Sequence, residues 1–394
     1  MSLLSNGNCN QSLGNIPISK TVQERVYDDD TDADSPLETR RTSCNITKLP
    51  DDCLNIIFNC LTTLDHKSTR DDSNSSGLTC RQWLHIQNGN CKVLKLADPK
   101  NESFAVVLFK LLGRFQYLKH LFLKSDIPEI TAFLISKPPC FESKVQHLNL
   151  DHCYKNSDSE FSSMFSCFPH LTSISLGSIH SLSLGSFYIT DKGLEALAKC
   201  CSFLEEVRLS GCESITDSGI RFLLQNCRKL HSLCIRSCGK ITGIGFLECP
   251  KTLTRFEASM CKLKPEGIKA VVSGGGLEHL SFYEFSKAGE GSINTQAVVT
   301  ISKGCPLLKK LCLRNCKDVE LEGWEAIGRN CKNLEILGVR RCRKLCDEGL
   351  QALGNGCNKL YELWLDTEQS YSSFAIELFK REKPQCYIHF YILS

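Results

Sequence analysis

The stretch that decides the fold is Cys201-Ser-Phe-Leu204-Glu-Glu-Val207-Arg-Leu209-Ser-Gly-Cys212. The same pattern of apolar residues and cysteines begins again 26 residues later, at Cys227. Further copies start at Cys305 and Cys331. The spacing L-x-x-L-x-L closed by Asn or Cys, repeated roughly every 20 to 29 residues, is typical of leucine-rich repeats. Chance apolar runs would not keep one phase over several copies.

Each copy combines a strand with a helix. Around Val207 and Leu209 apolar and polar residues alternate, which predicts a short strand with one buried face. After Thr216-Asp217, either of which is a suitable N-cap, apolar residues recur every three to four positions, which predicts a helix. One strand and one helix cannot bury a core alone, so neighbouring copies must stack. The expected fold is therefore an α/β leucine-rich-repeat solenoid, a right-handed βα superhelix shaped as a horseshoe arc, with strands on the concave side.

Looser copies extend the pattern towards the N-terminus, down to Val93-Leu94-Lys95-Leu96. We therefore assign residues 89–394 to the solenoid, with roughly nine or ten repeats, well above the minimum of about three.

The cysteines have a structural explanation. Many of the 25 fall at the two fixed repeat positions, where a small buried thiol packs at the end of a strand or of a helix. Met1 to Lys20 lacks the continuous apolar stretch of a secretory signal, so free thiols in a reducing compartment are expected. A zinc site is the alternative, suggested by the spacings Cys312-x-x-x-Cys316, Cys342-x-x-x-Cys346 and Cys234-x-x-x-Cys238. Repeat spacing already explains one member of each pair, so no metal is predicted.

The composition sets further limits. The formal charge is +3 over 394 residues, and no apolar stretch approaches the length of a membrane span, so neither nucleic acid nor membrane is an expected partner. Residues 1–43 are polar and then acidic, with the run Asp28-Asp29-Asp30-Thr31-Asp32, which predicts a disordered tail.

A second element, residues 44–88, lies between tail and solenoid. After Leu49-Pro50 the apolar residues follow at i, i+3, i+4 and i+7, one face of a helix of about three turns with Pro50 in its first turn. These residues are Leu54, Ile57, Phe58 and Leu61. A second helix is expected near Cys80-Arg81-Gln82-Trp83. About 40 residues make only a small core, so this unit should pack on the first repeat or on a partner.

Three features of this element resemble the F-box motif: Leu49-Pro50, the apolar series after it and Cys80-Arg81-Gln82-Trp83. Their position directly before cysteine-rich leucine repeats is similar to that in the F-box/leucine-rich-repeat proteins, the plant branch in particular. The resemblance covers roughly residues 44–394. The chain departs from the motif at Asp65 to Ser76, which is polar where the family has an apolar-rich segment, so a shortened middle helix is expected.

This resemblance implies a non-catalytic substrate receptor of an SCF-type cullin-RING ubiquitin ligase, found in the nucleus or the cytoplasm. The F-box would bind the Skp-type adaptor, and the solenoid would bind a protein substrate whose identity the sequence does not reveal. No cofactor is implied. The implied adaptor contacts are Leu49, Pro50, Leu54, Ile57, Phe58 and Trp83.

Two other functions remain open at this point. A solenoid can scaffold or inhibit a protein without any link to ubiquitin, and residues 44–88 would then form only an N-terminal cap. An enzyme is the contrasting class, but Gly274-Gly275-Gly276 precedes a strand and lacks the lysine of a phosphate-binding loop.

The concave face is predicted from the strand pattern, since residues flanking the buried leucines point outward. The position after the second buried residue gives a column of Ser210, Arg236, Ser259, Tyr283, Arg314, Arg340 and Asp366. Arginines in one column favour binding of a carboxylate or a phosphate. The predicted substrate contacts are Arg208, Arg236, Arg314 and Arg340, with Tyr283 and Trp364 as aromatic anchors.

Overall fold

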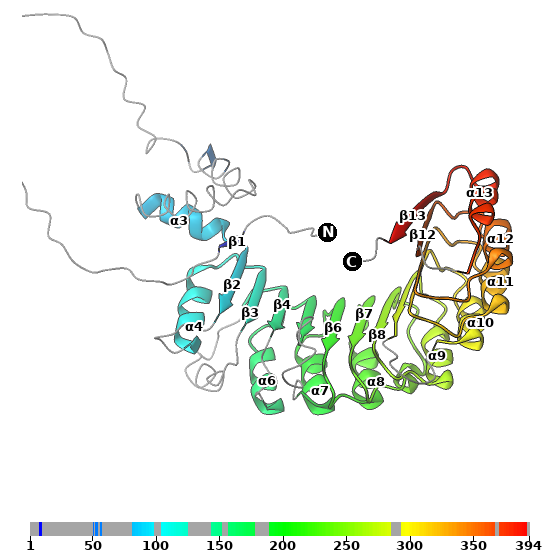
Figure 1. Cartoon of the computed structure of the whole chain (residues 1–394). Helices are drawn as coiled ribbons and strands as arrows, with labels where there is room; N and C mark the ends of the chain where they lie inside the picture. Colours follow the sequence, from blue (N-terminus) through cyan, green and yellow to red (C-terminus); the bar gives the residue numbers. More distant parts are fainter. Residues whose placement is uncertain are drawn as a thin grey trace, which may run out of the picture.

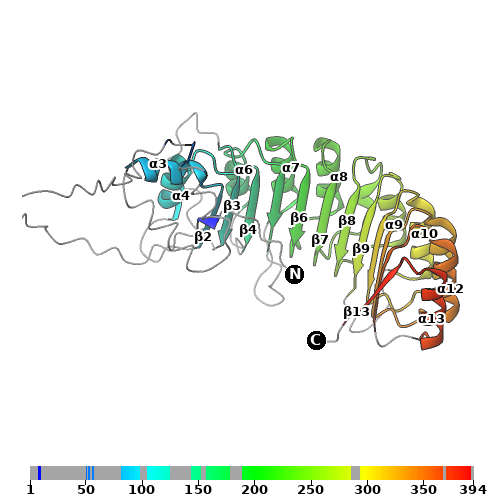
Figure 2. The same ribbon diagram turned by 90° about the horizontal axis from the view of Figure 1, so that it is seen from above.

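The computed structural model describes residues 8–9, 50, 52–53, 56, 81–97, 104–124, 143–151, 157–177, 189–284, 293–366 and 370–391. In this part of the chain the strands form one 13-stranded parallel sheet that follows chain order from β1 to β13. The strands line the inner side of an arc and the helices its outer side (Figure 1). Seen from above, successive strands and helices follow one another along the arc (Figure 2). The predicted leucine-rich-repeat solenoid is confirmed.

The strands are β1 (Asn8–Cys9), β2 (Val93–Ala97), β3 (His120–Lys124), β4 (His147–Asp151), β5 (Ser173–Leu176), β6 (Glu206–Ser210), β7 (Ser232–Arg236), β8 (Arg255–Ser259), β9 (His279–Tyr283), β10 (Lys310–Arg314), β11 (Ile336–Arg340), β12 (Glu362–Asp366) and β13 (Tyr387–Tyr391). The helices are α3 (Arg81–Asn90), α4 (Phe104–Arg114), α6 (Asp158–Phe165), α7 (Asp191–Cys200), α8 (Asp217–Asn226), the 3-10 helix η2 (Ile244–Phe246), α9 (Pro265–Val272), α10 (Thr295–Gly304), α11 (Leu321–Asn330), α12 (Asp347–Gly356) and α13 (Ser373–Glu382). The sheet has more strands than the nine or ten repeats predicted, partly because β1 and β13 lack the leucine pattern on which that prediction was based.

The alternating strand pattern builds the core. In β10, Leu311 and Leu313 are buried between sheet and helices, while Arg314 remains partly exposed on the inner side. Each strand pairs with the next in the same register, so Leu311 lies opposite Leu337 and Arg314 opposite Arg340. The buried leucines therefore form continuous rows along the arc, and so do the residues that face its inner side.

One repeat is shorter than its neighbours. The Thr172 hydroxyl donates to the carbonyl 26 residues earlier, but the equivalent Thr254 bonds to His231, only 23 residues earlier. The missing residues come from the outer side, where η2 replaces a full α-helix.

Aspartates join consecutive repeats on the helical side. Thr216 caps α8, and both its N–H and its hydroxyl donate to the carboxylate of Asp191 in the preceding helix, at 2.8 and 2.6 Å. A glycine makes room for that carboxylate, since a Cβ on Gly219 would lie 2.5 Å from Asp191 Oδ1. Asp158, Asp217 and Asp347 bond in the same way to Thr190, Thr242 and Ser372. The motif Thr-Asp-x-Gly thus caps its own helix and also holds the next repeat.

Replacing Asp191 with alanine should therefore destabilise the solenoid beyond the loss of a surface charge. Two hydrogen bonds to a charged group disappear and the partly buried Thr216 N–H loses its acceptor, so we expect a loss of about 2 kcal/mol in the free energy of unfolding. Urea unfolding of the full chain measures this. Glu195→Ala in the same helix removes only an exposed ion pair with Lys199 and should change stability by less than about 0.5 kcal/mol. Equal losses in the two variants would refute the inter-repeat role.

At the N-terminal end α3 contacts the first repeat. Ile86 is buried, and Arg114 Nε of α4 donates to Asn88 Oδ1 at 2.8 Å. The helix ends at Asn90, two residues beyond the predicted boundary at 88. The predicted tail (1–43) and the polar segment Asp65 to Ser76 lie outside the described residues, apart from β1, which pairs with β2.

Candidate functional site

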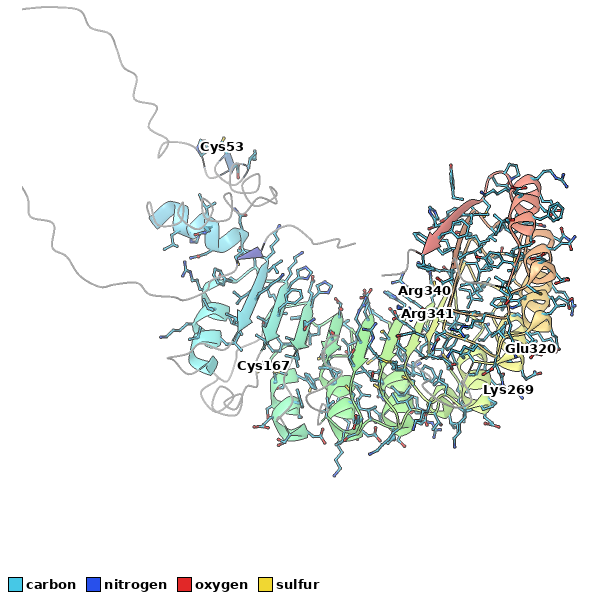
Figure 3. All side chains as sticks on the ribbon, viewed as in Figure 1. Cys53, Cys167, Lys269, Glu320, Arg340 and Arg341 are labelled. Atoms are coloured by element: carbon cyan, nitrogen blue, oxygen red, sulfur yellow. The ribbon has the colours of Figure 1, made fainter. Side chains whose placement is uncertain are left out.

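The inner side of the arc carries only part of the predicted column. Arg236, Tyr283, Arg314 and Arg340 are partly exposed there. The prediction was wrong for Ser210, Ser259 and Asp366, which are buried. Strand register places its central members next to one another on successive strands, in the order Ser210, Arg236, Ser259, Tyr283, Arg314 and Arg340. Asp366, at the equivalent place in β12, lies opposite Tyr391 of β13. Arg340 lies towards the inner side of the arc, whereas Lys269 lies on its helical side (Figure 3).

Two arginines of this column stack on tyrosines. The guanidinium carbon of Arg314 lies 4.4 Å from the centre of the Tyr283 ring. That of Arg340 lies 4.9 Å from the ring of Tyr391. Such contacts fix the plane of a guanidinium while its N–H groups stay available. We call Arg314 and Arg340 the arginine pair.

The arginine pair lacks the ion pair that Arg236, three strands away on β7, forms with Glu257. Arg236 Nη2 lies 3.9 Å from Glu257 Oε1, a contact between two partly exposed side chains. In the described part of the chain, neither Arg314 nor Arg340 forms an ion pair, and the Nε atom of each is buried without a hydrogen-bond partner. The buried Nε atoms are out of reach of a ligand, but both side chains are partly exposed. The outer N–H groups of the two guanidiniums are therefore the donors that an incoming anion would meet.

Trp364 belongs to an aromatic group beside the arginine pair. Its ring stacks on His389 at a centroid distance of 4.3 Å and is tilted against Tyr391 at 5.4 Å. The indole N–H donates to the carboxylate of Glu362 on the same strand. We call Trp364, His389 and Tyr391 the aromatic group.

Tyr391 reaches across the sheet from β13. A Cβ on Gly338 of β11 would lie 3.3 Å from the Tyr391 hydroxyl and 3.3 Å from Cys312 Sγ, so the glycine leaves room for that side chain. Burial raises the pKa of Tyr391, and the charges of Arg340 and Arg314 act in the opposite direction. Both the geometry and the electrostatics therefore join Tyr391 to the arginine pair.

One acidic residue lies close to the arginine pair. Asp366 is only 2% exposed, and its Oδ2 accepts the N–H of Arg341 at 2.8 Å, while its Oδ1 is buried without a hydrogen-bond partner. This carboxylate is held by the turn after β11.

The sequence predicted six substrate contacts on this face: Arg208, Arg236, Tyr283, Arg314, Arg340 and Trp364. In the structure they do not form a single cluster. Arg208 is exposed on β6, far along the sheet from Trp364 on β12, and Arg236 contacts Glu257. His389 and Tyr391 were missed, because Tyr387-Ile-His-Phe-Tyr391 lacks leucines. Its alternation of apolar and polar residues was the available signal.

The cysteines proposed for the zinc alternative do not converge. Cys312 is partly exposed on the inner side, whereas Cys316 is buried after the strand with its thiol 3.7 Å from the Arg314 carbonyl. Cys342 is buried in the same way, with carbonyls of its own and the preceding strand within reach. Among the residues that the structure describes, no three His, Cys, Asp or Glu side chains are grouped to hold a metal ion. Burial raises the pKa of Cys305 to about 12, so this thiol packs as a neutral group.

Little of the predicted adaptor-binding segment is described. Pro50 is exposed, and its carbonyl accepts the N–H of Cys53 at 3.0 Å, the first turn of the predicted helix. Ile56 is 63% exposed, a large apolar side chain open to solvent. Trp83 lies in α3, but its side chain is outside the described set, as are Leu49, Leu54, Ile57 and Phe58.

No helix within the described ranges combines the length and apolar character needed to cross a bilayer.

Comparisons with known proteins agree with this architecture. The family model "Leucine Rich repeat" matches residues 200–224. F-box/LRR-repeat protein 12 of Arabidopsis thaliana is 39% identical over 313 residues, which cover 76% of this chain and 73% of that protein.

Among solved structures, Rad7 in its complex with Elc1 from yeast is similar over 86% of this chain and 92% of that one, with a TM-score of 0.49 and 18% identity. An internalin of Listeria monocytogenes matches over 79% and 77%, with a TM-score of 0.44 and 15% identity. The sequence relative carries the assignment: with 39% identity over most of both chains, this chain belongs to the F-box/LRR-repeat proteins.

Proposed function

We propose that this chain is the substrate-recognition subunit of an SCF-type E3 ubiquitin ligase. Residues 44–88 bind the Skp-type adaptor, which links the chain to a cullin-RING ligase, and the concave face of the solenoid binds a protein substrate for ubiquitination and degradation. The observation that carries the proposal is that, in this chain, an F-box-like segment precedes a leucine-rich-repeat solenoid, together with the similarity to a relative named for both.

The architecture of the solenoid is consistent with a non-catalytic, protein-binding role. A rigid parallel sheet presents a long face on which charged and aromatic side chains are held in register, as a protein-binding surface requires. The chain would act in the nucleus or the cytoplasm.

A scaffold without a ubiquitin link is the second candidate. The contact of α3 with the first repeat, through Ile86 and the Arg114–Asn88 hydrogen bond, is what an N-terminal cap would make. The two functions differ in one property, which is adaptor binding by residues 44–88.

A pull-down of purified Skp-type adaptor by the full chain separates them. The triple variant Leu49→Ala, Pro50→Ala, Ile57→Ala should weaken adaptor binding about 1,000-fold, because truncation of two interface hot spots costs about 2 kcal/mol each. Cys53→Ser changes an exposed side chain outside the predicted apolar face and serves as the matched control.

Circular dichroism must show the same folded solenoid in all three proteins. Adaptor binding that survives in Cys53→Ser and disappears in the triple variant supports the receptor. If the folded wild-type chain fails to capture the adaptor, residues 44–88 are a cap and the scaffold is the better description.

A further inference from the structure

The arginine pair has the geometry of an oxyanion site. Arg314 and Arg340 lie opposite each other on adjacent strands, which run about 4.8 Å apart. Tyr283 holds one guanidinium and Tyr391 the other, at 4.4 and 4.9 Å from ring centre to guanidinium carbon. Two neighbouring guanidiniums with fixed planes present several N–H donors to a single carboxylate, the arrangement that favours bidentate recognition.

No carboxylate in the described part of the chain forms an ion pair with either guanidinium, although that of Asp366 lies close by. Both arginines are partly exposed, so their outer N–H groups face a ligand, while the Nε atoms are buried. Arg236, in the same column, is paired with Glu257, so position in the column alone does not create the site. The buried Asp366 is bonded to the Arg341 N–H, and its second oxygen is likewise unpartnered.

An apolar surface adjoins the arginine pair. Gly338 lies opposite Trp364 in the strand register and Arg340 comes two residues after Gly338, so the indole and the guanidinium are separated by about two residues of strand. Trp364 stacks on His389, and both are partly exposed. A ligand that places an anion on the arginine pair therefore meets aromatic side chains one or two residues further along its own chain.

We propose that the arginine pair and the aromatic group bind an extended segment of a substrate protein in which an Asp or Glu side chain stands within two residues of an aromatic or large aliphatic one. The carboxylate accepts hydrogen bonds from Arg314 and Arg340, and the apolar side chain packs on Trp364. The word substrate rests on the proposed function, but binding of the segment does not. A phosphoserine offers the same oxyanion chemistry, and the experiment separates the two.

Selection from a random decapeptide library on the immobilised full-length chain tests this directly. The wild-type chain should enrich peptides with an acidic residue near an aromatic or aliphatic one. An enriched peptide, resynthesised with Glu→Gln, should bind about tenfold more weakly or worse by fluorescence anisotropy, because charge-assisted hydrogen bonds are lost. A phosphoserine version of the same peptide, if it binds more tightly than the Glu version, assigns the site to a phosphorylated segment and overturns the carboxylate assignment.

Substitutions of the arginine pair and of Trp364 show which side chains set the acidic and the aromatic preference of the selected peptides. Arg314→Gln with Arg340→Gln should abolish the acidic preference, and Trp364→Ala should abolish the aromatic one. The matched control, Arg221→Gln with Arg228→Gln, removes the same charge from two exposed side chains of α8 and the turn after it, and should keep both preferences. Acidic enrichment that survives in the first double variant, or no acidic enrichment on the wild type, contradicts the proposal.

A pull-down of the Skp-type adaptor with the same proteins distinguishes failure of the ligase assignment from failure of the peptide-binding site. All of these variants should still bind the Skp-type adaptor if the proposed function is right. Peptide binding that depends on the arginine pair in a chain that captures no adaptor would leave this site intact and remove only the ligase assignment.

Discussion

Replacing Trp324 with alanine should lower the free energy of unfolding by about 3 to 5 kcal/mol, because a large side chain with 0% exposure leaves a cavity between two repeats. Trp324 projects from α11 against the next helix, where a Cβ on Gly349 would lie 3.3 Å from the tryptophan Cβ. The indole therefore fills space that the following repeat has left for it. Urea unfolding of the full chain, followed by circular dichroism, measures the loss.

Trp364→Ala is the matched control for this prediction. Trp364 is partly exposed on the concave face and stacks on His389. Its removal should cost only about 1 kcal/mol, the loss of a stacked aromatic contact, since no closed cavity results. A Trp324→Ala protein as stable as the Trp364→Ala protein would mean that the repeats do not depend on this interlock.

Gly356→Ala should be nearly as damaging, by overpacking rather than by a cavity. A Cβ at Gly356 would lie 2.0 Å from the carbonyl oxygen of Gly328, so the ends of α11 and α12 could not keep their distance. Lys332 Nζ donates to both carbonyls, at 2.9 Å to Gly328 and 3.1 Å to Gly356, and any separation strains these bonds too. Because the obstacle is backbone, we expect a loss of about 3 kcal/mol, the upper part of the range for overpacking.

Gly113→Ala provides the control of opposite sign. Gly113 lies near the end of α4, and a Cβ there meets nothing within 4 Å. Alanine should raise stability by up to about 1 kcal/mol through helix propensity alone. If thermal unfolding shows both glycine variants shifted in the same direction, the close approach of α11 and α12 is not what fixes Gly356.

The fold could be predicted from the sequence because a 26-residue step forces stacking of strand on strand. The pattern from Cys201 to Cys212 predicted the strand and its buried face, and the apolar residues after Thr216-Asp217 predicted the helix. The sequence alone did not reveal how repeats are joined laterally. Thr216-Asp217 indicated a helix start, but the bond from Thr216 to Asp191 spans 25 residues and is visible only once the register is known.

The candidate site was predictable only in part, for a related reason. Strand alternation identified Arg314 and Arg340 as neighbours on the concave face. Whether each arginine is free depends on side-chain geometry, and the contact of Arg236 with Glu257 is not encoded by spacing. Tyr391 reaches its position across β12 to lie over Gly338, which no periodic pattern predicts.

The most direct test of the central claim is co-elution of the full chain with purified Skp-type adaptor and the N-terminal part of a cullin on gel filtration. We expect one complex that contains all three proteins, and its loss in the Leu49→Ala, Pro50→Ala, Ile57→Ala variant while that variant's solenoid stays folded. A folded wild-type chain that elutes alone, apart from an adaptor and cullin that bind each other, would contradict the account.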